Sequence, residues 1–286
     1  MRRPGVGRKG TRLGRLFRFS PLAVLGVAIF LAWVVVALVA PWIAPYDPRA
    51  QNVDLRFSPP GSTYLLGSDN LGRDILSRVV YGARVSLPAG VIVVVLAAAV
   101  GILVGSLAGF LGGWADEALM RMAEIIMAFP PIILAMAVAA ALGRSFLNAV
   151  VAIVLVWWPS YARMTRGLVI SAKENEYVQA ARAFGASPAR VLFRTVLPNC
   201  LGPVLVMASV DLGNATLTFS GLSFLGLGVV PPTPEWGAMV ATGSAAFTYW
   251  WVSVFPGLAI LSLAMGFNFI GDAVRDFMEP RLRRQL

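Results

Sequence analysis

Long apolar stretches separated by short polar segments constrain this 286-residue chain more than any other feature. A helix needs about 20 apolar residues to cross a bilayer, and lipid offers no water to unpaired backbone groups, so helices are the favoured spanning form. With 58% hydrophobic and 13% charged residues, a soluble domain is excluded, and we predict an all-α integral membrane protein with six transmembrane helices. The candidate spans lie roughly at 21–44, 84–111, 118–142, 147–166, 201–229 and 251–274.

The net charge is +10, and the positions of the basic residues fit this predicted topology. Basic residues gather before the first span, around 163–200 and after the last span, and six spans put these three regions on the same side. Lys and Arg mark the cytoplasmic side of a membrane, so we expect both termini in the cytoplasm. The segment 45–83 carries four arginines and four aspartates and follows the rule less well. The basic excess is expected to serve topology and attraction to membrane lipid, with no nucleic-acid binding.

The sequence lacks the patterns expected of a Cys/His metal site or of a phosphate-binding loop. Cys200 is the single cysteine and there is no histidine, which excludes an internal disulfide and a Cys/His metal site. Cys200 is expected to be a small packing residue. The phosphate-binding pattern Gly-x-x-x-x-Gly-Lys-Ser/Thr is also missing from the sequence. We therefore expect no metal site, no cofactor and no ATPase activity in this chain.

A polar, basic segment at 176–199 separates two apolar stretches. Spacings of i, i+3, i+4 and i+7 place small and aromatic side chains on one face of a short helix. Two alanines in that face favour close docking into a groove of another protein. The face consists of Tyr177, Ala180, Ala181 and Phe184.

The same segment carries signals for helix ends. Gly185 stands where a glycine follows a helix C-terminus, and Ser187-Pro188 is typical of an N-cap followed by the first helical residue. Pro198 is expected to end this second helix. The segment is therefore predicted to form two small helices hinged at a glycine.

These residues resemble the cytoplasmic "EAA" loop of ABC importer permeases. Its pattern is Glu-Ala-Ala, three residues, Gly, nine residues, Ile, any residue and Leu-Pro. Gln179 replaces the motif glutamate and Thr195 the isoleucine, whereas the residues that shape the backbone match. The resemblance implies that 174–199 couples the membrane helices to an ATPase. The matching positions are Gln179, Ala180, Ala181, Gly185, Thr195, Leu197 and Pro198.

A second segment, LLGSDNLGRDILSRVVYGARVSL at 65–87, resembles the residues that precede the second span in dipeptide, oligopeptide and nickel permeases. Its Gly-Ser-Asp-Asn opening predicts a turn. Asp74 and Arg78 are expected to pair at i,i+4 on a short helix. The resemblance covers nearly the whole chain from Ser20 and points to the shorter, C-type permease. Further matching blocks lie at 112–121, 128–135, 221–228, 231–239 and 271–283.

What the resemblance implies is half of a transport channel with the type I ABC importer permease fold, in the bacterial inner membrane. The expected partners are a longer B-type permease, two ATPases that bind ATP and Mg, an extracytoplasmic substrate-binding protein and a peptide substrate moved by alternating access. The expected regions are a basic cytoplasmic terminus at 1–20, an anchor helix with an extracytoplasmic segment at 21–83, a permease domain at 84–275 and a cytoplasmic tail at 276–286.

Small residues and prolines in the spans indicate how the helices pack. Gly101, Gly105 and Gly109 form a small-xxx-small stripe, which lets another helix approach closely. Pro130-Pro131 and Pro159 are expected to interrupt the third and fourth spans, and Gly213, Gly221, Gly226 and Gly228 to loosen the fifth. Interrupted helices at membrane depth line protein-covered or wet cavities. We expect these three spans around the translocation path and the first span at the periphery.

Asp211 is the one acid well inside a predicted span, with Asn214 one turn further. An ionisable residue in the membrane is costly and indicates function by default. It either lines the translocation path and meets the cationic amino terminus of a peptide, or it is a packing acid bonded to a neighbouring group, which we prefer. An aromatic belt at the outer surface is expected from Trp236, Tyr249, Trp250 and Trp251.

Three alternatives to peptide import stay open at this stage. A permease for nickel or another small solute, such as a metal chelate or a glutathione-like compound, would share the family blocks. An ion-coupled secondary carrier would need a relay of intramembrane acids, and only Asp211 qualifies. A structural membrane anchor poorly explains the glycine stripe, the proline breaks and the docking segment.

Overall fold

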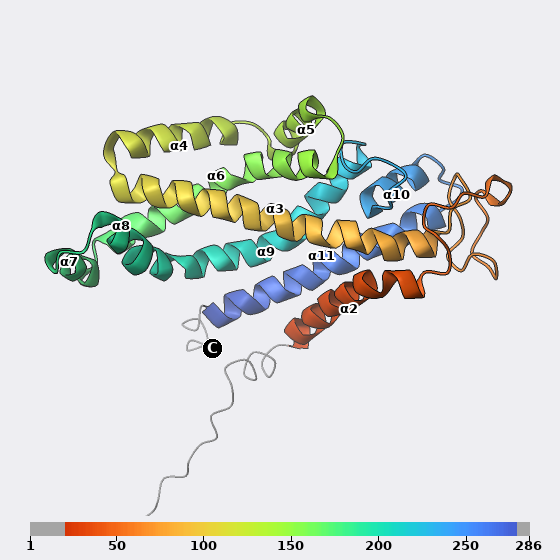
Figure 1. The fold of residues 1–286 in the computed structure, drawn as a ribbon, viewed down its shortest axis with the longest axis horizontal. Coiled ribbons are helices and arrows are strands. Elements are labelled where there is room, and N and C mark those ends of the chain that lie inside the picture. Colours follow the sequence, from red (N-terminus) through yellow and green to blue (C-terminus); the bar gives the residue numbers. More distant parts are fainter. Residues whose placement is uncertain (1–20, 279–286) are drawn as a thin grey trace, which may run out of the picture.

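Five long helices form the body of the protein in a computed structural model that describes residues 21–278. They run approximately along the long axis of the molecule (Figure 1), and the described residues contain no β-strand. Each is long and apolar enough to cross a membrane. They are α2 (Pro21–Ile43), α3 (Ile75–Leu111), α6 (Phe146–Lys173), α9 (Leu197–Phe224) and α11 (Trp251–Met278).

The third predicted span is not a continuous helix. It consists of α4 (Gly113–Met127) and α5 (Pro131–Leu142), which are bent by 91° at a short break and together satisfy the criteria for a sixth span. Proline has no N–H to continue the hydrogen bonding of the preceding turn, and Pro131 starts a new helix. The interruption at Pro130-Pro131 is thus confirmed, and the broken span begins at Gly113 rather than at 118.

Other helix boundaries also differ from the expected ones. The second span begins at Ile75 rather than 84, because the segment predicted to be a short helix forms the first turns of α3. Pro159 does not interrupt the fourth span, since α6 runs through it to Lys173. The fifth span ends at Phe224, so that Gly226 and Gly228 lie outside it.

The glycine stripe of α3 packs against α6, as predicted. A β-carbon on Gly101 would collide with Tyr161, and one on Gly105 would collide with the backbone of Ala162. A β-carbon on Gly109 would lie 2.8 Å from the carbonyl oxygen of Arg166. Such distances are shorter than van der Waals contact, so only glycine permits this helix approach.

Helix α2 lies at the periphery of the bundle (Figure 1), as expected for an anchor. Only 11% of its apolar window is buried, compared with 44% for α3 and 50% for α6. Gly26 is its closest approach to α11, where a β-carbon would lie 2.8 Å from the carbonyl oxygen of Gly266. The beginning of α2 and the end of α11 both lie away from the loops at 45–74, consistent with termini on one side of the membrane.

The predicted aromatic belt is wrong for two of its members. Trp236 is fully buried at the start of α10 (Trp236–Ser244), donates its indole N–H to the Val79 carbonyl at 2.8 Å and packs on Trp33. Trp251 is also buried, and its indole N–H donates to the Ser68 carbonyl. Trp236 thus joins α10 to α3 and α2, and Trp251 joins α11 to the loop that contains Ser68. Trp250 is exposed, as a belt residue would be.

Candidate functional site

The predicted docking segment begins with a helix that ends as its sequence indicates. Helix α7 (Glu176–Ala183) is followed by Gly185 in the left-handed region, at φ 78°. The Gly185 N–H donates to the Arg182 carbonyl at 2.9 Å, and the Ala186 N–H donates to the Ala181 carbonyl at 3.1 Å. These two bonds define a Schellman motif, whose glycine avoids the steric cost of a β-carbon.

The second helix of the segment does not end at Pro198, contrary to expectation. Helix α8 (Pro188–Arg190) is capped by the Ser187 hydroxyl and continues through a π-helical stretch, η2 (Val191–Val196), directly into α9. A π-helical stretch shifts the hydrogen-bond register, and Pro198 follows it within the first two residues of α9. The segment after Gly185 is therefore the beginning of the fifth span rather than a separate small helix.

The predicted docking face is divided by the structure. Phe184 is 92% exposed and Tyr177 is 43% exposed, and Ala180 is exposed beside them. Ala181 instead packs inward against the cluster that contains Val178 and the buried Cys200. Of the four residues of the predicted face, two aromatic rings and one small residue are thus exposed. Of the remaining motif positions, Gln179 and Pro198 are exposed and Leu197 is half-buried.

Polar contacts tie the docking segment to the end of α3. The Lys173 ammonium donates to the Gly109 carbonyl at 3.1 Å, and the Arg182 guanidinium lies 5.7 Å from the centre of the Phe110 ring. Nearby, Arg166 of α6 forms a two-pronged ion pair with Asp116 of α4, its Nη2 atom lying 2.7 Å from Oδ2. Arg121 and Glu124 of α4 form a second ion pair, at 3.1 Å, on the exposed surface.

Asp211 lies in a cavity between α6 and α9. The Tyr161 hydroxyl donates to Oδ2 of Asp211 at 2.7 Å, and Asn214 lines the same cavity three residues further along α9. The cavity has a volume of about 450 Å³. The structure thus brings together the two residues expected at the translocation path, and it adds Tyr161, whose separation by 50 residues gave no signal in the sequence. Further lining residues are Pro131, Trp157, Ser160, Met207, Leu217 and Thr218.

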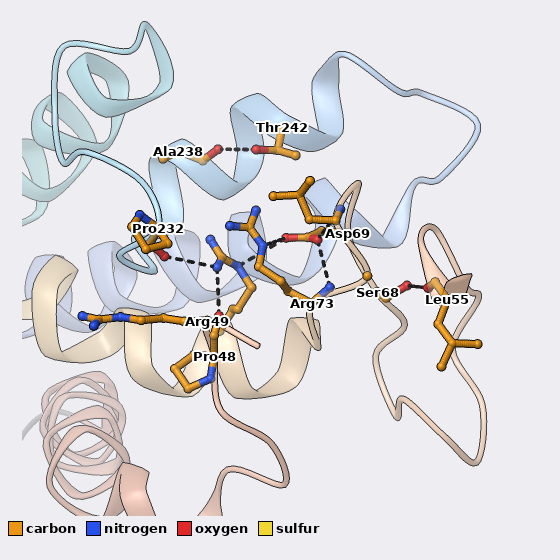
Figure 2. A network of polar contacts seen from close by, with 12 residues as sticks. Pro48, Arg49, Leu55, Ser68, Asp69, Arg73, Pro232, Ala238 and Thr242 are labelled. Carbon is orange, nitrogen blue, oxygen red and sulfur yellow. Dashed lines mark hydrogen bonds and ion pairs between the residues drawn. The ribbon is translucent and has the colours of Figure 1, made fainter. Parts of the chain in front are cut away.

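At the opposite end, Asp69 holds a buried ionic network (Figure 2). Its Oδ2 atom lies 2.7 Å from Nε of Arg73 and 3.5 Å from Nε of Arg78. The predicted pair of Asp74 with Arg78 is wrong, because the Asp74 carboxylate caps α3 and accepts the Ser77 N–H at 2.7 Å. Arg78 also donates to the carbonyls of Pro48 and Pro232, which joins two loops far apart in sequence.

Glu235 is a further buried acid at this end, besides Asp69 and Asp74. It is fully buried at the N-terminus of α10 and accepts the backbone N–H groups of Gly237 and Ala238, each at 2.9 Å. The Ser86 hydroxyl of α3 donates to it at 3.2 Å. Burial raises the pKa of the Glu235 carboxyl, and the hydrogen bonds that it accepts oppose that shift. No sequence prediction included Glu235, although negatively charged side chains are favoured at helix N-termini.

The described residues contain no group of three or more His, Cys, Asp or Glu side chains that could hold a metal ion. The spans, the broken pair and the exposed aromatic segment define a multi-pass membrane protein of the transport class. Residues 101–284 match the family described as binding-protein-dependent transport system inner membrane component, and residues 12–60 match the N-terminal transmembrane domain of oligopeptide transport permease C. The chain belongs to this family of inner-membrane permease subunits and has the type I ABC permease fold.

Curated relatives match almost end to end. The probable D,D-dipeptide transport system permease protein DdpC of Escherichia coli is 42% identical over 95% of this chain and 92% of its own length. The di/tripeptide transport system permease protein DppC of Pseudomonas aeruginosa is 44% identical over 93% of this chain and 90% of its own. The dipeptide transport system permease protein DppC of Haemophilus influenzae is 40% identical over 94% and 93%.

Proposed function

We propose that this chain is the C-type permease subunit of an ATP-driven importer that moves di- and oligopeptides delivered by an extracytoplasmic binding protein. Its family membership and the names of its relatives, which are permeases for dipeptides and di/tripeptides, support this substrate class. The nickel and small-solute alternatives have no comparable support in those names. The observation that carries the proposal is the exposed aromatic surface of α7, fixed by a Schellman turn to the beginning of a span.

Coupling between ATP and transport follows from the continuity of this segment with α9. Tyr177 and Phe184 dock into a groove of the ATPase subunit, whose closure on ATP moves α7. Because α8, η2 and α9 are continuous, that motion passes directly to the helix that carries Asp211. The cavity between α6 and α9 then opens alternately to the two sides of the membrane. This chain breaks no bond of the substrate. Such a rigid-body change shifts a population between two packed arrangements.

The complete assembly contains this chain, a B-type permease, two ATPases and the binding protein, with ATP and Mg held by the ATPases. Reconstitution in proteoliposomes tests the proposal. Dipeptide uptake should require internal ATP and the binding protein, and an imposed proton or sodium gradient should not replace ATP. Gradient-driven uptake without ATP would establish the secondary-carrier alternative instead. The purified chain alone should neither bind nor hydrolyse ATP, and measurable hydrolysis by it would contradict the proposed division of labour.

A further inference from the structure

The carboxylate of Asp211 has polar neighbours but no cationic partner in the described part of the chain. The Tyr161 hydroxyl hydrogen-bonds it, and Asn214 also lines its cavity. None of the four salt bridges among the described residues includes it, and no lysine or arginine lines its cavity. A carboxylate at membrane depth without a counter-charge is costly. A cation bound in this cavity would offset that cost, and the described lining residues do not supply one.

The rest of the cavity lining has the chemistry of an amine site rather than of a metal site. Trp157 offers an aromatic face of the kind that attracts ammonium groups. Ser160 and Thr218 provide hydroxyl oxygens, and Leu217 and Met207 make the walls partly apolar. The described residues bring no second carboxylate to this cavity, whereas hard divalent cations are bound by several oxygen ligands. One carboxylate, the aromatic rings of Trp157 and Tyr161 and hydroxyl acceptors suit a primary ammonium group with three N–H donors.

We propose that the Asp211 cavity is a subsite for the protonated amino group of the transported solute. This inference rests on the proposed function and narrows it, because the permease itself then prefers substrates with a free amine. Tyr161 is a positioning residue, since its hydroxyl holds the carboxylate oxygen Oδ2 at 2.7 Å. The competing occupant of the cavity is a lysine or arginine side chain of the B-type permease. Charge-selective labelling distinguishes this side chain from the amino group of the solute.

Charge selectivity of thiol labelling tests the site directly. Thr218→Cys, in a Cys200→Ala background of the full permease–ATPase complex, places a single thiol of this chain in the cavity lining. In detergent, where both faces are accessible, a trimethylammonium-ethyl thiosulfonate should react faster than its anionic sulfonatoethyl counterpart. A cleft with charge of one sign enriches its counter-ion by about tenfold or more. Asp211→Asn should reduce this rate ratio about tenfold, and Asp211→Glu should retain it.

The matched control is Glu117→Gln, which removes the same charge from α4, outside the cavity lining, and should leave the ratio unchanged. If the parent complex shows no preference for the cationic reagent, a partner residue already neutralises Asp211 and the proposal is wrong. If the preference survives Asp211→Asn, another charge creates it and the proposal is equally wrong. If the complex with Asp211→Asn fails to assemble, the proposal is decided by the ratio of labelling rates in the parent complex and by the protection of its thiol by peptides.

Peptide protection tests amine recognition without the selectivity of the binding protein. Excess dialanine should slow the reaction of the Thr218→Cys thiol with uncharged N-ethylmaleimide in complex lacking binding protein, and N-acetyl-dialanine should not. Equal protection by both peptides, or by neither, overturns the amine subsite. Failure of the proposed function looks different: ATP-driven dipeptide uptake is absent while charge-selective labelling persists. Uptake that persists without charge selectivity overturns only this inference.

Discussion

The two ends of the helical bundle are built in opposite ways. At the outer end, the loops at 45–74 and α10 are held by buried polar groups, among them Asp69, Arg78 and Glu235. At the inner end, Tyr177 of α7 and Phe184, which directly follows this helix, are exposed on the surface of the chain. Figure 1 places these regions at opposite ends of the long axis. Buried ionic and polar groups of the chain itself thus fix the outer loops to the bundle, whereas the docking segment exposes aromatic rings suited to a partner.

The largest expected effect comes from breaking the outer network. Asp69→Asn keeps the shape of the side chain but leaves the guanidinium groups of Arg73 and Arg78 without their counter-charge, and both side chains are at most 7% exposed. Removing one partner from a buried ionic network typically costs about 3–5 kcal/mol. Thermal unfolding of the purified complex should therefore show a clear loss of stability. The control is Arg121→Ala, which removes an exposed pair with Glu124 and should cost about 1 kcal/mol or less. Equal shifts in unfolding temperature for both variants would show that the buried outer network stabilises the protein no more than an exposed ion pair does.

The next effect should appear in function rather than in stability. Phe184→Ala removes a ring that is 92% exposed, so the folded chain should unfold at an unchanged temperature. If this ring anchors the ATPase, co-purification of the ATPases and ATP-driven uptake should each fall by about tenfold or more, since an aromatic anchor at an interface contributes roughly 2 kcal/mol. Phe247→Ala is the matched control, because Phe247 is 87% exposed in the outer loops. Normal ATPase binding by Phe184→Ala would remove α7 from the coupling mechanism.

Much of the inner end could be predicted from local signals. Gly185, Ser187 and Pro188 act through the backbone within a few residues, so their sequence positions specify their conformations. The glycine stripe of α3 is equally local, and its partner only had to be a helix. The inward packing of Ala181 was missed because helical spacing assigns a residue to a face but does not say which side the rest of the chain covers.

The outer end was harder to predict because its contacts join residues far apart in sequence. Asp69–Arg73 and Asp74–Arg78 have the same i,i+4 spacing, and only the use of Asp74 as a helix cap decides between them. Trp236 resembled a membrane-surface aromatic, yet it is buried because Gly82 leaves room for its ring, 2.6 Å from where a β-carbon would lie. The bend of 91° between α4 and α5 is invisible to hydropathy, which records length and composition but no direction.

A smaller effect is expected at the hinge of the docking segment. Gly185 has φ 78°, and a β-carbon there would meet no atom within 4 Å, so Gly185→Ala adds conformational strain alone. The left-handed conformation costs a residue with a β-carbon about 1 kcal/mol. Hydrogen exchange should therefore be faster in α7 and unchanged in the outer loops. Gly167→Ala is the control, because Gly167 lies within α6, also has open space around it and needs no such conformation. Equal exchange in both variants would show that the Schellman turn does not stabilise α7.

The smallest effect is expected from two cysteine variants, which report the side of the membrane that each end of the bundle faces. Both variants should leave transport unchanged. Ser62→Cys lies in an exposed outer loop and Ala189→Cys lies in the exposed first turn of α8. In a Cys200→Ala background, each variant carries a single thiol of this chain, because Cys200 is the only native cysteine. A membrane-impermeant maleimide added to intact spheroplasts should label position 62, and position 189 should react only after the membrane is opened. The basic residues around 163–200 dictate this orientation through the positive-inside rule. Labelling of position 189 in intact spheroplasts would invert the topology and place α7 beyond the reach of any cytoplasmic ATPase.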